Sequence, residues 1–154
     1  NRGMSEAEIL ADMSYPPELF DHPWMAPTYG CADYIVRDLY REENGWWDRN
    51  PTTLHPSPPD QAASEILSAL GDPATVVNRA KELAQKGQTQ LALHVIDLVA
   101  LAPGDDPMVA EARAVKAELC RVRSEEVEPF VSKSCYRSSA RLLDEGHTSW
   151  QDLP

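Results

Sequence analysis

Tyr29–Pro59 reads YGCADYIVRDLYREENGWWDRNPTTLHPSPP, and the character of the chain changes sharply within it. The apolar positions of 32–44 recur at helical spacing and predict an amphipathic helix, which Gly45 ends. An aromatic pair, Trp46 and Trp47, follows, and then a charged turn and a proline-rich exit that must run extended. Aromatic bulk, a charged turn and a rigid exit together indicate a surface that docks against something.

The composition limits the classes of partner. The chain has 154 residues, which fits one domain, and a formal net charge of −11. Binding to nucleic acid or to an anionic membrane needs clustered Lys and Arg, and no basic cluster is present. No apolar run approaches the roughly 20 residues that cross a bilayer. We therefore expect neither nucleic acid nor membrane as a partner.

The cysteines and the first residue bear on where the protein works. Three cysteines without CxxC spacing predict neither a disulfide framework nor a zinc site, which favours a reduced, cytoplasmic protein. The first residue is Asn1 rather than methionine, so we expect the chain to be a fragment of a longer protein. A missing N-terminus leaves a secreted or periplasmic location open.

Helical periodicity predicts an all-α fold of about six helices in antiparallel hairpins. The predicted helices are 32–44, 59–70, 73–86, 88–101, one from 107 past Val122, and one from near Pro129 to 145. The fourth is apolar over a wide arc and is expected to be the most buried. The apolar positions assigned to these helices include Ile66, Leu91, Leu98, Val122, Phe130, Cys135 and Leu142.

The N-terminal stretch is proline-rich, and it sets the predicted domain division. Prolines at 16, 17, 23 and 27 predict an extended arm without regular helix across 15–28. The prediction is an arm and linker at 1–28, a helical domain at 29–146 and a tail at 147–154. The arm's apolar side chains need cover. A strap over the chain's own core and an arm that faces a partner are both open.

A period of 34 residues separates Asp72-Pro73 from Asp106-Pro107, and this is the tetratricopeptide period. The match is one degenerate unit, whereas a stable solenoid normally needs about three. We interpret it as tetratricopeptide-like hairpin packing. An alternative function is a free-standing adaptor that binds a peptide, with Asn78, Gln85 and His94 lining an open surface.

No catalytic set is recognisable in this chain. The histidines His22, His55, His94 and His147 are scattered, and neither a zinc-binding motif nor a nucleophile motif occurs. The segment 46–51 is the remaining candidate for a functional site, and two interpretations of it have equal weight. In the first, its indoles fix the first helix on the core while Asp48 and Asn50 close a turn. In the second, its aromatic side chains anchor an interface.

The same segment resembles the start of the dimerisation domain of the alkyl sulfatases of the metallo-β-lactamase superfamily. The residues that carry the resemblance are Tyr29-Gly30, Val36-Arg37, Gly45-Trp46-Trp47-Asp48, Asn50-Pro51, Leu54 and Pro56. The hairpin up to Leu101-Ala102-Pro103 and the later Tyr136-Arg137-Ser138-Ser139-Ala140 are also similar. The resemblance covers roughly Tyr29 to Glu145, and its GWWD-x-NP core is its most specific part.

The resemblance implies a homodimerisation domain whose partners are a second copy and a metallo-β-lactamase-fold hydrolase domain. In that family the hydrolase domain holds two zinc ions through a His-x-His-x-Asp-His motif, which is absent here, so zinc is expected only in a missing catalytic domain. The parent would be a zinc-dependent hydrolase of sulfuric esters. The positions implied at the interface or at the approach to the active site are Tyr29, Arg37, Trp46, Trp47, Asp48 and Asn50.

One position departs from the family pattern. Arg49 stands where the family usually has glycine. If the backbone there needs a positive φ, arginine is strained, and the turn around Asp48 and Asn50 takes a different shape.

Overall fold

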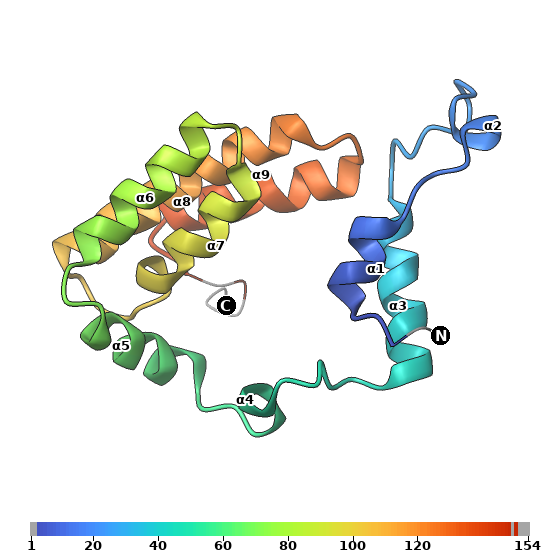
Figure 1. Ribbon diagram of the computed structural model, residues 1–154. Helices are drawn as coiled ribbons and strands as arrows, with labels where there is room; N and C mark the ends of the chain where they lie inside the picture. Colours follow the sequence, from blue (N-terminus) through green and yellow to red (C-terminus); the bar gives the residue numbers. More distant parts are fainter. Residues whose placement is uncertain (1–2, 149, 151–154) are drawn as a thin grey trace. The chain divides into compact units, whose positions relative to one another are not determined.

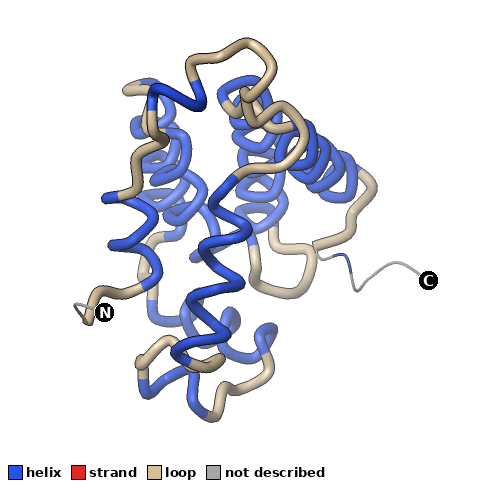
Figure 2. Tube along the Cα trace, turned by 90° about the vertical axis from the view of Figure 1, so that its right-hand side faces the viewer, coloured by secondary structure: helices blue, strands red, loops and turns tan. Residues whose placement is uncertain are grey.

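The computed structural model describes residues 3–148 and 150, and within them the chain forms helices and no strand (Figures 1 and 2). The all-α prediction is therefore confirmed. In order, the helices are α1 (Glu6–Asp12), α2 (Pro17–Phe20), α3 (Ala32–Asn44), α4 (Pro51–Leu54), α5 (Pro59–Ala69), α6 (Pro73–Gln85), α7 (Thr89–Ala100), α8 (Pro107–Glu126) and α9 (Phe130–Asp144). The six predicted helices correspond to α3 and α5–α9.

The described chain divides into two compact units. The first unit contains residues up to 56 together with 128–131, and the second contains 57–127 and the chain from 132 onward. The boundary at 56 and 57 falls in the proline-rich exit that the sequence marks as rigid. The division predicted from the sequence, at 28 and 146, stays a prediction.

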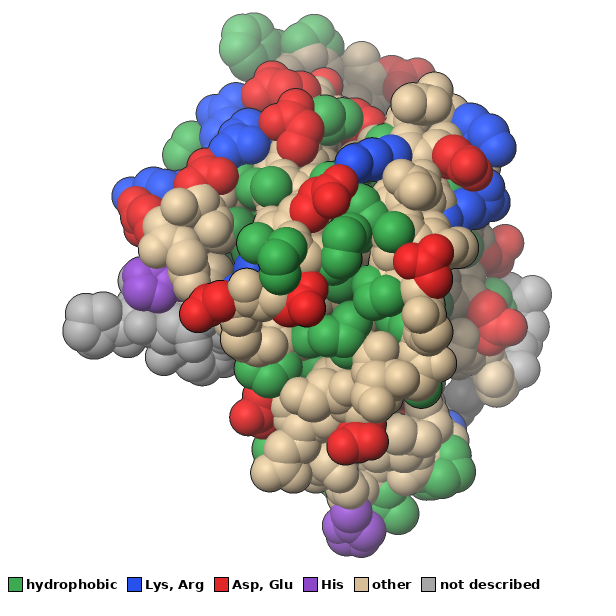
Figure 3. Space-filling view, turned by 90° about the vertical axis from the view of Figure 1, so that its left-hand side faces the viewer, with side chains coloured by type: hydrophobic (Ala, Val, Ile, Leu, Met, Phe, Trp, Pro, Cys, Tyr) green, Lys and Arg blue, Asp and Glu red, His purple; other side chains and the backbone are tan. Residues whose placement is uncertain are grey.

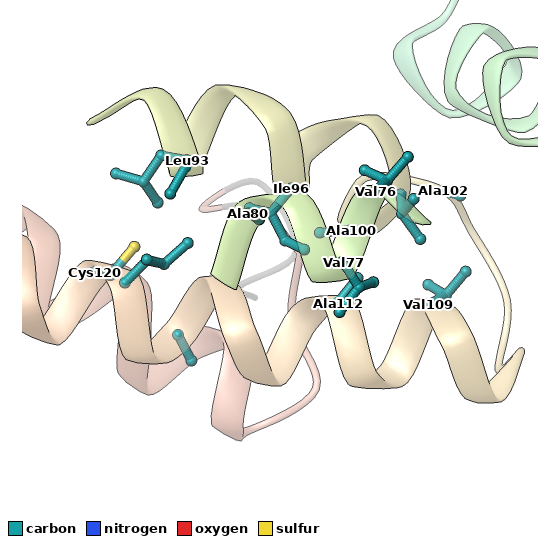
Figure 4. Close-up of a cluster of buried hydrophobic side chains, with 14 of the residues drawn as sticks. Val76, Val77, Ala80, Leu93, Ile96, Ala100, Ala102, Val109, Ala112 and Cys120 are labelled. Atoms are coloured by element: carbon teal, nitrogen blue, oxygen red, sulfur yellow. The ribbon is translucent and has the colours of Figure 1, made fainter. Parts of the chain in front are cut away.

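The second unit holds the hydrophobic core. Helix α7 packs against both α6 and α8, and six of its 12 residues are buried, which agrees with the expectation that this helix is the most buried. Figure 4 shows Val77, Ile96 and Ala112 meeting from these three helices. Small residues such as Ala80 and Ala92 are fully buried, and they let the helices approach closely.

Both Asp-Pro pairs start helices, as predicted. The Asp72 carboxylate accepts a hydrogen bond from the Ala74 amide at 3.1 Å, and Asp106 accepts one from the Met108 amide at 2.8 Å. Proline follows at the first helical position in both, where its missing N–H costs nothing. The period of 34 residues thus reflects two helix starts that share an aspartate cap and a first-turn proline. The finer tetratricopeptide-like description stays a prediction.

Several side chains that the sequence assigned to inward faces are in fact exposed. They are Ile66, Leu91, Leu98, Val122, Phe130 and Cys135. Helix α7 explains two of the errors. It is apolar on most sides, so periodicity alone does not choose its inward face. The neighbours α6 and α8 bury Ile96, which the sequence assigned inward, together with Leu93 and Ala100, which it did not.

The proline-rich stretch contains one helical turn that was not expected. Helix α2 occupies Pro17–Phe20, with Pro17 in the first turn. The prediction of no helix across 15–28 was therefore wrong over these four residues. Proline forbids helix interiors, but it suits the first position because its fixed φ is already helical.

The surface is mixed in character. Figure 3 shows, on one face, a patch of apolar side chains with acidic and basic ones scattered around it. Within residues 3–148 and 150, no helix has both the length and the apolar character required to span a bilayer.

Candidate functional site

The part of the first unit that the structure describes has no hydrophobic core. None of its described residues is buried, in contrast to the second unit. Its large apolar side chains are exposed, with Trp24 at 86%, Trp46 at 73%, Tyr29 at 72% and Ile35 at 63%. Monomeric proteins seldom leave so much aromatic surface uncovered, and such surfaces mark interaction sites.

Segment 3–56 is nevertheless held together by specific contacts. Ser5 caps α1 in a reciprocal capping box with Glu8. Glu6 lies 3.4 Å from the Arg37 guanidinium of α3, and the Ala32 amide at the start of α3 donates to the Tyr15 hydroxyl at 3.4 Å. A cavity of about 670 Å³ lies along α1 and α3 and reaches Asp48. The segment is thus an ordered body with an uncovered surface.

The motif GWWDRNP forms a hydrogen-bonded turn. The Asp48 carboxylate accepts from the Asn50 amide at 2.9 Å and from the Thr53 hydroxyl. Asn50 caps α4 by accepting from the Thr52 amide at 3.1 Å, and the Trp47 indole N–H donates to the Asn50 carbonyl at 2.9 Å. The hydroxyl of Thr53 and the Asn50 amide hold the pKa of Asp48 below its ordinary value.

This geometry shows which residues of the motif close the turn and which leave their side chains exposed for an interface. Trp47, Asp48 and Asn50 close the turn through their side chains. Trp46 is 73% exposed, so its indole remains available to a partner. Arg37 is engaged with Glu6. The structure places all six residues implied by the resemblance in the first unit, and their roles stay a prediction.

Arg49 adopts the backbone conformation in which glycine would be expected. Its φ is +70°, and it is the one non-glycine residue with positive φ in the described chain. The guanidinium donates to the Asn44 carbonyl at 3.1 Å and lies 5.7 Å from the Trp47 ring centroid. These contacts offset strain that costs about 1–2 kcal/mol for a residue with a Cβ.

Two substitutions of Arg49 should distinguish the cost of its backbone strain from the stabilisation by its side-chain contacts. We expect Arg49→Ala to lower the free energy of unfolding by about 1 kcal/mol, because it loses both contacts and keeps the strain. Arg49→Gly loses the same contacts but adopts the φ freely, so it should be about 1 kcal/mol more stable than Arg49→Ala. Denaturant unfolding followed by tryptophan fluorescence measures both. Equal stability of the two variants would show that this φ carries no strain.

One contact of the first unit was not foreseen from the sequence. Phe130 and Val131, the first residues of α9, donate their amides to the carbonyls of Thr28 and Tyr29 at 2.7 and 3.0 Å. The rings of Tyr29 and Phe130 stack with centroids 6.0 Å apart. The sequence carried one signal for it. Pro129 precedes the helix and has no side-chain group that could cap it.

The second unit has a pocket of its own. It encloses about 530 Å³ and is lined by Leu93, His94, Lys116 and Cys120, among others. The ammonium group of Lys116 lies 2.7 Å from the Asp97 carboxylate, and burial raises the pKa of the Cys120 thiol. Asn78 and Gln85 are exposed but do not line this pocket. The three polar residues named for an adaptor groove therefore do not share it.

Metal-binding geometry is lacking in the part of the chain that the structure describes. No three His, Cys, Asp or Glu side chains come together there as metal ligands would. The chemistry that the described surface supports is association through exposed aromatic and aliphatic side chains.

Comparison with known proteins adds the family. The family model described as alkyl sulfatase dimerisation matches residues 5–146. The chain belongs to the alkyl sulfatase dimerisation family. This match reaches further toward the N-terminus than the Tyr29–Glu145 range in which the sequence shows the resemblance, and it includes α1 and α2.

The relatives of this family member are alkylsulfatases. An (R)-specific secondary-alkylsulfatase of Pseudomonas sp. is 27% identical over 95% of this chain and 22% of its own length. An alkyl/aryl-sulfatase of Saccharomyces cerevisiae is 26% identical over 95% of this chain and 22% of its length. The chain thus spans about a fifth of these relatives. The solved structure of a stereoselective inverting sec-alkylsulfatase from Pseudomonas sp. superimposes with a TM-score of 0.80 at 26% identity, covering 95% of this chain and 23% of that one.

Proposed function

We propose that this chain is the homodimerisation domain of an alkyl-sulfatase-like hydrolase and that a second copy covers the exposed surface of its first unit. The observation that carries the proposal is that no described residue of this unit is buried, although it contains four helices. A body of this kind gains stability only when another surface removes its apolar side chains from water.

Helix α3 offers the most regular part of this surface. Ile35 and Leu39 are 63% and 54% exposed, and their spacing of four residues places them on one face of the helix. Tyr34 beside them is also exposed, at 38%. Obligate dimers bury about 2,000 Å² or more, mostly apolar, and an uncovered apolar helix face supplies the kind of surface that such interfaces use.

The proposal extends to the parent protein, since the relatives are much longer than this chain. A metallo-β-lactamase-fold domain would supply the hydrolysis and would hold the zinc. Trp46 and Tyr29, both exposed, would help to shape the approach to that domain's active site. A His-x-His-x-Asp-His motif encoded upstream of Asn1 would support this extension, and a start codon directly before Asn1 would contradict it.

Dimerisation is tested by placing charge on α3. We expect the wild-type chain to sediment as a dimer at micromolar concentration. The double variant Ile35→Glu with Leu39→Glu should raise the dimer dissociation constant at least tenfold, a loss of about 1.4 kcal/mol, because burying two carboxylates without partners opposes association. Analytical ultracentrifugation over a concentration series measures the shift.

A matched control lies in the second unit. The double variant Leu91→Glu with Leu98→Glu introduces the same two charges at leucines that are 52% and 41% exposed, and it should leave the dissociation constant unchanged. Circular dichroism should show full helicity for all variants, since each site is already exposed. A monomeric wild-type chain would overturn the proposal. An unchanged dissociation constant in the double variant would exclude α3 from the interface.

A further inference from the structure

The pocket of the second unit is built from that unit alone. It encloses about 530 Å³, within the range of roughly 300–1,000 Å³ that is typical of small-molecule sites. Its lining comes from the first residue of α5, from α7, α8 and α9, and from the chain that follows α9. Figure 4 shows two of the lining residues, Leu93 and Cys120, at the same end of the hydrophobic core. The pocket therefore lies beside the core and does not depend on the first unit.

The walls of the pocket are mainly apolar. Leu93 of α7 and the neighbours Leu142 and Leu143 of α9 line it, together with Leu101 and Trp150. The last two are 44% and 52% exposed. A ligand with an apolar body would remove part of this surface from water, which favours its binding.

One ion pair supplies opposite charges to the pocket. Asp97 of α7 and Lys116 of α8 both line it, and Nζ of the lysine lies 2.7 Å from Oδ1 of the aspartate. Among the described residues that line the pocket, no other is Asp, Glu, Lys or Arg. The positive and the negative charge balance each other, so the pocket favours a neutral ligand over an ion.

The ion pair leaves hydrogen-bonding capacity unused. Oδ1 of Asp97 is buried and accepts no hydrogen bond within the described chain, so its close approach to Lys116 lacks ordinary hydrogen-bond geometry. The Lys116 side chain is only 18% exposed, and its ammonium group, which carries several donors, has no other partner among the described residues. The Asp97 side chain is 38% exposed, so a ligand would reach its carboxylate at the other oxygen. Because polar groups without partners are costly in a sheltered site, a ligand that both donates and accepts is favoured.

A hydroxyl group meets these requirements. It is at once a donor and an acceptor, so it can accept from Lys116 while it donates to Asp97, and it is neutral. A carboxylate has no donor and an ammonium has no acceptor, and either ion would face a like charge in the pair. The formal net charge of −11 further opposes an anionic ligand.

We propose that this pocket binds a neutral aliphatic alcohol. The hydroxyl group lies between Lys116 and Asp97, and the alkyl chain runs along Leu93, Leu142 and Leu143. This site goes beyond the proposed homodimer. It stands on residues of the second unit only, and its test does not depend on the oligomeric state.

Titration of the whole chain with matched ligands tests the chemistry of the site. The probe is hexan-1-ol, added to ¹⁵N-labelled protein at about pH 8, where a free imidazole is mostly uncharged. The indole N–H signal of Trp150, assigned with the variant Trp150→Phe, reports binding. We expect a saturable shift with hexan-1-ol. The affinity should be at least tenfold lower for 1-methoxyhexane, which lacks the donor, and for hexanoate and hexylammonium, which carry charge. A shift that does not saturate, or equal affinity for the alcohol and its methyl ether, would overturn the proposal.

A double variant tests the role of the ion pair. Asp97→Leu with Lys116→Met replaces both charges by apolar side chains and leaves no unpaired charge behind. It should weaken hexan-1-ol binding at least tenfold and remove the preference for the alcohol over the ether. The control is Lys81→Met with Glu111→Leu, because this exposed pair has the same separation of 2.7 Å and lies outside the pocket. The control should keep the wild-type affinity. Wild-type affinity and preference in the Asp97 and Lys116 variant would contradict the proposal.

A second pair of variants tests the location. Ser139 lines the pocket from α9, and Ser139→Phe should abolish binding because the ring would occupy the space of the alkyl chain. Ser134 is exposed on the same helix and does not line the pocket, so Ser134→Phe should bind like the wild type. Unchanged binding in Ser139→Phe would exclude this pocket. The ligand series on the wild-type chain decides the chemistry even if a variant fails to fold.

Discussion

Ile96→Ala is expected to lower the free energy of unfolding by about 3–4 kcal/mol. Ile96 is fully buried in α7, between α6 and α8, and Figure 4 shows its side chain reaching toward Val77 and Ala112. Its truncation removes three methylene-sized groups from a place where three helices meet. Several neighbours are alanines, such as Ala80 and Ala92, and these cannot extend into the space that the truncation leaves. The cavity should therefore persist, and thermal or urea unfolding of the second unit measures its cost.

The matched control is on the same helix. Leu91→Ala removes a similar side chain that is 52% exposed, and it should cost less than about 1 kcal/mol. Comparable losses for the two variants would place Leu91 in a buried environment and would contradict the orientation of α7.

The pattern of the sequence was enough to locate the long helices but not to orient all of them. Asp72 and Asp106 with their following prolines, and Gly45 at the end of α3, are local signals whose chemistry acts over one helical turn. The inward face of α7 is different. It depends on which neighbours pack against an almost uniformly apolar helix, and that information is tertiary.

The candidate site shows the same limit. Asp48 and Asn50 could be assigned to a turn because Asx side chains bond the backbone two residues on. The condition placed on Arg49, a positive φ, is met at +70°. Pro129 signals that α9 lacks a side-chain cap, but Thr28 and Tyr29 could not be predicted as the residues that cap it, since backbone carbonyls carry no side-chain signature and the partners are about a hundred residues apart.

The two units differ in the way they obtain stability, and this difference connects fold to function. The second unit buries a core of aliphatic and small side chains, whereas the first has ordered helices, specific hydrogen bonds and no buried residue among those that the structure describes. Hydrogen bonds fix geometry but add little net stability in water. This contrast is the basis of the proposed homodimer, in which a second copy would cover the apolar surface of the first unit.

Arg113→Ala is expected to destabilise the second unit by about 2–4 kcal/mol, although Arg113 lies outside the hydrophobic core. Its guanidinium donates to three backbone carbonyls, those of Ala100 at 3.3 Å, Ala102 at 2.6 Å and Gly104 at 3.2 Å. These carbonyls belong to the end of α7 and to the loop before α8. Hydrogen bonds to a charged donor contribute about 1.5–3 kcal/mol each, and the three act together, so their sum overstates the loss.

The shape of the donor explains why this position should not tolerate lysine. A guanidinium presents its N–H groups in a planar fork, whereas an ammonium is a single point of charge. Arg113→Lys should therefore recover less than half of the stability that Arg113→Ala loses. Arg79→Ala is the control, since Arg79 makes an exposed ion pair with Glu82 at 2.9 Å and should cost about 0.5 kcal/mol or less. Urea unfolding measures all three. If Arg113→Lys had the same free energy of unfolding as the wild type, the positive charge near the end of α7 would be what stabilises the unit. The forked hydrogen bonds to the loop between α7 and α8 would then contribute little.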